Sequence, residues 1–187
     1  MWILRRQLSD KIYVINSIGL GAARWLLENR RSELDAYFPH FFMNRAEEMV
    51  RGMPQNTEVI LFFLKKRCSY AEELGEQGIL SALWRMAEEL HTGLQVHLRN
   101  IPIRQETVEI LERFDLNPYY ALSSGAFLVV TGNHEMLMDI VRDAGLTCDE
   151  IGELKSCIAR TVINGESVRY LDRPQKEELD KVRGLPH

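Results

Sequence analysis

Residues 71–86, AEELGEQGILSALWRM, place Gly78 at the start of an apolar helical pattern, directly after an acidic run that includes Glu73 and Glu76. The first backbone amides of a helix have no intrahelical partner, and the helix dipole favours negative charge there, so Gln77 and Gly78 could hold a phosphate group. A structural interpretation is favoured over this one, because glycine permits a tight turn and acidic side chains favour a helix N-terminus. The sequence leaves both interpretations open.

A second candidate lies in Ser123-Ser124-Gly125, just before the apolar run AFLVVT at 126–131. The backbone amides of such a turn could line a cleft. The alternative is a type I or II turn that only leads into a strand.

Other catalytic patterns are missing. The histidines, among them His91, His97 and His134, are spread over separate expected elements. They form no i, i+4 pair and have no cysteine or carboxylate at ligand spacing, so we expect no metal site. No serine lies in a G-x-S-x-G motif, which argues against a hydrolase triad. We therefore assign no catalytic residue from the sequence.

The composition is that of a globular protein. The 187 residues are 45% hydrophobic and 27% charged, a size that suits one domain. A formal net charge of −4 argues against a general nucleic-acid binder. The three cysteines are widely spaced and form no C-x-x-C, which favours a reducing, cytoplasmic location over a disulfide framework. The longest apolar runs, such as 59–64, are too short to span a membrane, and the MWILRRQLSDK start is not that of a signal peptide.

The elements that must position these residues alternate between strands and helices. In the first half, IYVI predicts a strand and a helix follows from Ala22, with ENRRSELD as a solvated polar stretch. A second helix is predicted over 44–53. The apolar run 58–64 could be a buried strand or the core of a helix, since periodicity does not separate the two.

In the second half, the pattern predicts a helix from residue 78 that stops at Gly93, a strand over 94–103, a helix over 104–114, a strand over 126–131 and a helix over 132–146 capped by Asn133. A strand at 148–156 and a hairpin with an Asn164-Gly165 turn follow. The tail, 173–187, is polar and is expected to be partly helical or loose. This order predicts an α/β fold, with α+β character, in which helices flank a mixed β-sheet.

The motifs between residues 78 and 154 occur in a known order: GILSALWRMAEELHTGLQV, IPIRQET, LNPYYALSSGAFLVV, a helix, and IGEL. This order resembles the C-terminal domain of the aminoimidazole ribonucleotide (AIR) synthetase-related superfamily. Within it, the pattern is most similar to the branch that contains the hydrogenase-maturation carbamoyl dehydratase and uncharacterised AIR synthase-related proteins. The resemblance starts near Lys11 and is stronger after residue 76 than before it.

This resemblance implies a protein with two domains, in which an N-terminal domain carries acidic metal-binding and nucleotide-binding residues and forms the dimer. The C-terminal domain contributes a glycine-containing loop and a helix that close over ATP, and the chemistry is ATP-dependent activation of a small amide or carboxamide. Residues 1–187 would then be a single C-terminal-type domain without the family's N-terminal domain. The implied cofactors are ATP and magnesium, and the implied partners are an N-terminal domain, a partner subunit or a second copy, with neither nucleic acid nor membrane.

Aligned on Gly78, the family's paired glycine corresponds to Gln77, its threonine to Gly75 and its acidic residue to Glu73. The resemblance therefore implies a nucleotide- or phosphate-binding set formed by Glu73, Glu76, Gln77, Gly78, Ser123, Ser124 and Gly125. The threonine hydroxyl is lost, and the chain ends in GLPH where the carbamoyl-carrying member ends in cysteine, so carbamoyl transfer through a tail is not expected. The alternative function is a non-catalytic, stand-alone binding module that kept the fold and lost the nucleotide chemistry.

Overall fold

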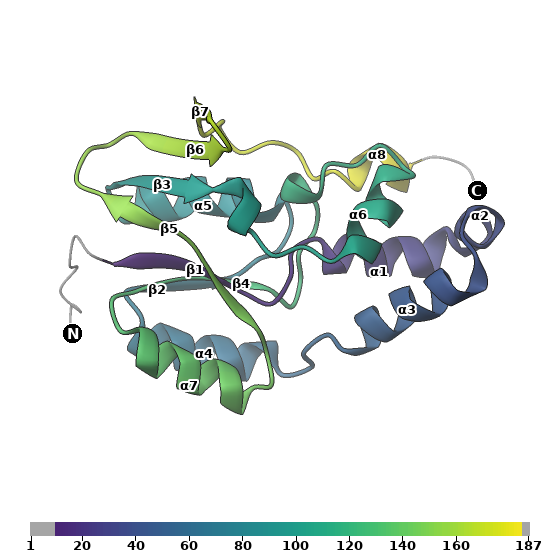
Figure 1. The fold of residues 1–187 in the computed structure, drawn as a ribbon, viewed down its shortest axis with the longest axis horizontal. Coiled ribbons are helices and arrows are strands. Elements are labelled where there is room, and N and C mark those ends of the chain that lie inside the picture. Colours follow the sequence, from purple (N-terminus) through teal and green to yellow (C-terminus); the bar gives the residue numbers. More distant parts are fainter. Residues whose placement is uncertain (1–9, 185–187) are drawn as a thin grey trace.

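The computed structural model describes residues 10–184, and in this range seven strands form one mixed sheet (Figure 1). The strand order is β2-β4-β1-β5-β3-β6-β7. Neighbouring strands are antiparallel except β3 and β6, which are parallel. The strands are β1 Lys11–Ile15, β2 Tyr70–Glu73, β3 Gly93–His97, β4 Phe127–Thr131, β5 Cys148–Lys155, β6 Arg160–Asn164 and β7 Ser167–Tyr170.

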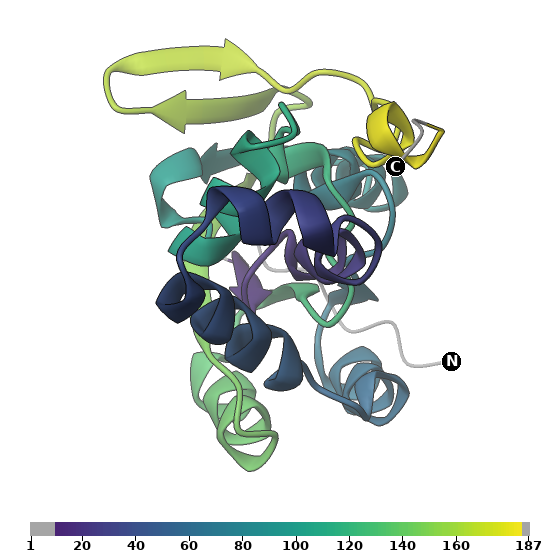
Figure 2. The ribbon, with the colours of Figure 1, turned by 90° about the vertical axis from the view of Figure 1, so that its right-hand side faces the viewer.

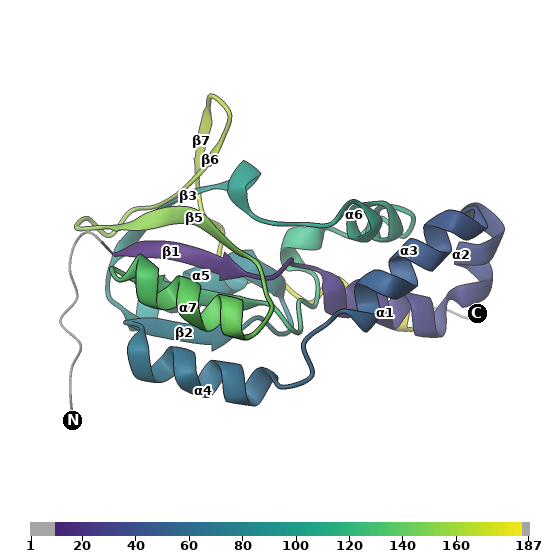
Figure 3. The same cartoon turned by 60° about the horizontal axis from the view of Figure 1, so that its bottom comes forward.

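Helices cover both faces of this sheet and continue beyond one end of it, which confirms the expected mixed sheet flanked by helices (Figures 1 and 3). They are α1 Leu20–Asn29, α2 Arg31–Tyr37, α3 His40–Arg51, α4 Thr57–Arg67, α5 Gly78–Glu89, α6 Gln105–Glu112, α7 His134–Asp143 and α8 Asp180–Arg183, with 3-10 turns η1 Leu98–Asn100 and η2 Pro118–Tyr120. Among the described residues, no helix is long and apolar enough to cross a membrane.

The alternation of side chains along β1 explains how the two layers form. Ile12 and Val14 pack in the cluster that contains the apolar stripe of α5. Tyr13 and Ile15 face the other way and pack with residues of α4 and α7. Because successive side chains of a strand point to opposite faces, a strand covered on both sides must be apolar at every position. β4 comes close to this requirement, since all five of its residues are buried and the first four are apolar.

A helical cluster, formed by α1, α2, α3 and α6, lies past the end of the sheet (Figures 1 and 3), and this end faces the viewer in Figure 2. Leu179 and Val182 of the C-terminal segment are buried in it. The expectation of a partly helical tail is confirmed by α8. Its alternative, a loose tail, is wrong for residues 177–184, because two apolar side chains anchor them. Residues 185–187 lie outside the described range.

Four local predictions were incomplete or wrong. The strand predicted over 94–103 ends at His97, where turn η1 follows. The run 58–64 is helical and belongs to α4, and the unpredicted strand β2 takes the sheet edge beside β4. The polar stretch after α1 forms helix α2. Gly93 does not stop α5 but begins β3, where a Cβ would lie 2.2 Å from the carbonyl oxygen of Cys157. The glycine is therefore required by the close packing of two backbones, and His91 takes the left-handed conformation after the helix instead.

Candidate functional site

The turn that begins α5 is built around two left-handed residues, Gln77 with φ 67° and Gly78 with φ 64°. A Cβ on Gly78 would lie 2.5 Å from the carbonyl oxygen of Tyr119 and 2.8 Å from Cα of Tyr120. The N-terminus of α5 thus packs directly on the backbone of turn η2. Gly78 is needed for this contact whether or not a ligand binds nearby.

Ser123 connects three loops and is fully buried. Its Oγ accepts a hydrogen bond from the backbone N–H of Gly19 and donates one to the carbonyl of Ala121, both at 2.8 Å. Its own N–H donates to the carbonyl of Gly75 at 3.2 Å. Because the hydroxyl is used on both sides, the observed role of Ser123 is to fix the loops and not to contact a ligand.

Glu73 is also engaged by the same turn. Its Oε1 accepts a hydrogen bond from the N–H of Gly125 at 3.0 Å. The carbonyl of Gly125 in turn accepts one from Nδ2 of Asn16 at 3.0 Å. Ser124 is half-buried, and its backbone nitrogen lies 3.1 Å from where a Cβ on Gly21 would be. The strand ends and loops around β1, β2 and β4 are therefore held together by Glu73 and Asn16.

The central feature of the site is a carboxylate from the C-terminal segment. Glu177 is only 6% exposed. Its Oε2 accepts a hydrogen bond from the N–H of Gln77 at 2.9 Å, and its Oε1 accepts from the N–H of Leu122 at 2.9 Å and of Leu179 at 3.2 Å. Amides from two distant loops thus converge on one oxyanion, at the entrance of α5. This is the donor arrangement that backbone nests and helix N-termini present to anions.

Charged side chains surround this cradle. Glu76 is exposed, and Nη1 of Arg183 lies 4.0 Å from its Oε1. Arg85 is placed between Gln77, whose Oε1 is 3.5 Å from Nη1, and Glu72, whose Oε1 is 3.6 Å from Nη2. Burial raises the pKa of the Glu72 carboxyl above its ordinary value, while Arg85 opposes that shift.

The magnesium ion that the family implies does not fit the residues of this chain alone. In residues 10–184 no group of three or more His, Cys, Asp and Glu side chains is placed to hold a metal ion. Oxygens of Glu73 and Glu177 already accept backbone hydrogen bonds, and of these three glutamates Glu76 alone is exposed. A magnesium ion takes near-octahedral oxygen ligands, so further ligands would have to come from elsewhere.

The structure places most of the sequence-predicted residues close together, where they hold the loops in place. Glu73, Ser123 and Gly125 hold the loops, while Gln77 donates to Glu177. Glu76 stays at the surface. Sequence reasoning missed Glu177, and the apolar Leu179 two residues later was the signal that this polar tail has a buried side.

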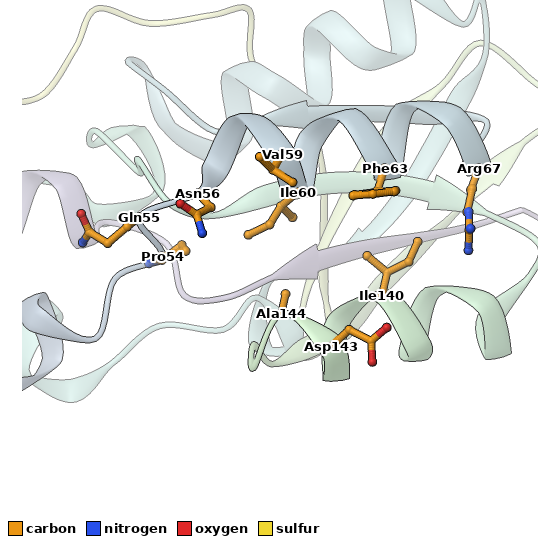
Figure 4. A pocket seen from close by; sticks show the side chains of 10 residues that line it. All are labelled: Pro54, Gln55, Asn56, Val59, Ile60, Phe63, Arg67, Ile140, Asp143 and Ala144. Atoms are coloured by element: carbon orange, nitrogen blue, oxygen red, sulfur yellow. The ribbon is translucent and has the colours of Figure 1, made fainter.

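Two hollows lie apart from the cradle. A depression of about 350 Å³ next to Asn16 has Arg45, Arg104 and Glu106 in its wall. A groove of about 440 Å³ runs between α4 and α7, with Phe63 on one side (Figure 4). Neither is lined by any of the seven predicted residues.

The sequence matches the family model described as AIR synthase related protein, C-terminal domain, over residues 9–158. No curated protein sequence matches the chain. Among solved structures, hydrogenase maturation protein HypE in complex with ATP has a TM-score of 0.66 at 14% identity, over 92% of this chain and 52% of that one. The HypE–HypF complex gives 0.65 at 17%, over 92% and 55%. ThiL complexed with AMPPCP and TMP gives 0.57 at 16%, over 87% and 50%.

At these identities the solved structures show a shared fold and nothing finer. The chain spans about half the length of each of them. What it has in common with them is the overall fold.

Proposed function

Because the chain belongs to the AIR synthase related protein family and corresponds to its C-terminal domain, we propose that it forms one half of an ATP-dependent assembly that activates a small amide or carboxamide. The other half is a nucleotide-binding domain or subunit, and residues 1–187 make up the single C-terminal-type domain. Support comes from the family match, from the half-length coverage and from neighbours whose structures contain ATP or AMPPCP.

One observation carries this proposal: the N–H groups of Gln77 and Leu122 converge on a single oxyanion. Gln77 bonds Oε2 and Leu122 bonds Oε1 of the Glu177 carboxylate, so in the proposed function two oxygens of one phosphate group of the nucleotide take their place. The dipole of the twelve-residue helix α5 adds to the attraction. The acidic side chains nearby, Glu73 and Glu76, repel a bare triphosphate, so magnesium held by the other half would be needed to offset that charge.

The test is an NMR titration of the full chain with Mg-ATP, following the amide signals of Gln77 and Leu122. We expect these two signals to shift in a saturable way with Mg-ATP and to respond far less to AMP, which lacks the β- and γ-phosphates. Shifts confined to another surface, or no shift at millimolar Mg-ATP, would refute a phosphate site at this position. A matched titration without magnesium reports whether the metal is needed.

A second candidate function, a non-catalytic binding module, is favoured by a specific feature. Val59, Phe62 and Phe63 on α4 are 46–55% exposed, an apolar patch typical of a surface that meets another protein. The HypE–HypF complex is a structure of one neighbour with a partner. Analytical ultracentrifugation of the chain and a Phe62→Asp variant tests self-association. A monomer in both cases, together with Mg-ATP shifts at Gln77, would exclude a homodimeric module.

We further infer a cytoplasmic location. The support is chemical: Cys68, Cys148 and Cys157 are all free thiols. Free thiols are typical of proteins in reducing compartments. Mass spectrometry of the protein from its native cells, after alkylation, would show three alkylated cysteines if this is correct.

A further inference from the structure

The segment after β7 crosses the molecule and returns to the entrance of α5. We define residues 172–184 as the C-terminal strap. Its first part, 172–176, is exposed and without regular structure, whereas Glu177, Leu179 and Val182 are buried. The strap therefore has an exposed lead and a docked end.

Polar contacts hold the docked end at four points. Glu177 accepts from the amides of Gln77 and Leu122, as described above. Oε2 of the neighbouring Glu178 accepts from the N–H of Asn117 at 2.9 Å. Nη2 of Arg30 donates to the carbonyl of Val182 at 2.8 Å. The strap is thus fixed to both loops that border the anion cradle.

Glu177 differs from the surface carboxylates of this protein because its charge is met by backbone donors alone. Within residues 10–184 it forms no ion pair, and its hydrogen bonds come only from backbone amides. Removing a carboxylate from water is unfavourable unless it is well hydrogen-bonded, so the cradle must be a good oxyanion site for Glu177 to lie there. The same amide cannot serve a carboxylate and a phosphate oxygen at once.

We propose that the C-terminal strap is an autoinhibitory element whose Glu177 carboxylate acts as an internal oxyanion, so that a phosphate group binds the amides of Gln77 and Leu122 only when the strap is released. This proposal rests on the proposed function, in which that phosphate belongs to a nucleotide. The exposed lead, 172–176, provides the slack for release. Leu179 and Val182 supply the apolar contacts that favour the closed state.

Competition of this kind sets a measurable penalty. A ligand that binds only the open state has an apparent affinity reduced by the open fraction. Replacing Glu177 removes the internal competitor, so affinity for a phosphate ligand should rise by about tenfold or more, which corresponds to about 1.4 kcal/mol. Conversely, a bound phosphate should release the strap and expose the amides of Leu179 and Val182 to solvent exchange.

The experiment compares the full chain with Glu177→Ala and Glu177→Gln, and uses Glu166→Ala as a control because Glu166 is an exposed carboxylate in the β6–β7 turn that is not part of the cradle. Inorganic pyrophosphate and Mg-ATP are titrated calorimetrically. Hydrogen exchange of the strap is measured with and without pyrophosphate. The glutamine variant keeps the size of the side chain and an acceptor oxygen, so it replaces the alanine variant if that one does not fold.

We expect pyrophosphate to bind Glu177→Ala about tenfold more tightly than the wild type or Glu166→Ala, and to speed exchange at Leu179 and Val182 in the wild type. Equal affinities in all variants, or tighter binding with an unchanged strap, would overturn the autoinhibitory role. If pyrophosphate binds in competition with the strap but Mg-ATP does not bind, the autoinhibitory role is supported and the nucleotide function is refuted. If Mg-ATP binds at Gln77 with an affinity that the Glu177 substitutions do not change, only the autoinhibitory role is refuted. If neither ligand binds to any variant, both proposals are refuted.

Discussion

Replacing Gly78 by alanine tests whether this glycine is required by packing. Gly78 has φ 64°, and its Cβ would lie 2.5 Å from the carbonyl oxygen of Tyr119. Gly145 gives a matched control, because it has φ 67° but no heavy atom within 4 Å of its added Cβ. Both substitutions place a side chain in the left-handed region, and only Gly78→Ala also forces two backbones apart.

The magnitudes follow from these two terms. A left-handed alanine costs about 1–2 kcal/mol, which both variants share. A contact of 2.5 Å with a backbone atom cannot be relieved by a side-chain rotation, so overpacking adds about 1–3 kcal/mol at Gly78. We therefore expect Gly145→Ala to lose about 1–2 kcal/mol of unfolding free energy and Gly78→Ala about 2–5 kcal/mol.

Urea denaturation followed by tryptophan fluorescence measures both losses, since Trp25 and Trp84 lie in the folded part of the chain. The difference between the two variants is the informative quantity, because it isolates the contact of α5 with turn η2. If Gly78→Ala is no less stable than Gly145→Ala, the close approach is not a constraint. The left-handed φ of 64° would then be the only structural reason for the glycine.

Three further predictions follow from the same structure. Ser123→Ala should lose about 2–4 kcal/mol of unfolding free energy, because the buried N–H of Gly19 and the carbonyl of Ala121 both lose a hydrogen-bond partner. In urea denaturation, the control variant Ser124→Ala should stay within about 0.5 kcal/mol of the wild type. Equal losses in the two variants would contradict the loop-fixing role of Ser123. Burial raises the pKa of the Cys68 thiol to about 11, and burial together with the charge of Asp149 raises the pKa of the Cys148 thiol to about 12. At pH 8 a thiol-reactive dye should therefore label only the exposed Cys157 rapidly in the native protein, and all three thiols after denaturation. Rapid labelling of all three thiols in the native protein would refute this prediction. Burial raises the folded-state pKa of the Glu72 carboxyl above its unfolded value, so the contribution of Glu72 to stability is present at low pH and is lost as the pH rises through the raised pKa. In urea titrations between pH 4 and pH 7, the wild type should therefore lose stability relative to Glu72→Gln. The control variant Glu166→Gln should show no such trend relative to the wild type.

Local patterns in the sequence determined much of the fold. The apolar spacing of α5 follows from how a helix buries one face, and the short β-branched and aromatic runs of β1 and β4 are typical of buried strands, so local pattern and composition predict all three. The cap at Asn133 is also local, since its Oδ1 accepts from the N–H of Met136 three residues later at 3.0 Å. The order of these motifs was enough to indicate the family.

Other features depended on contacts between distant parts of the chain. The run 58–64 is apolar on all sides, and only the pairing of β2 with β4 leaves it outside the sheet as part of α4. Gly93 resembled a helix stop, but the carbonyl of Cys157 is what requires it.

The candidate site shows the same division. The sequence indicated the turn at Gln77 and Gly78 as a helix entrance that either binds an anion or is only a tight turn, because glycine and the helix period are local signals. It did not indicate that the anion is Glu177, which is 100 residues further along the chain. A polar tail has no periodicity that reveals which of its carboxylates is buried; only the docking of Leu179 and Val182 in the helical cluster brings Glu177 to the amides of α5 and Leu122.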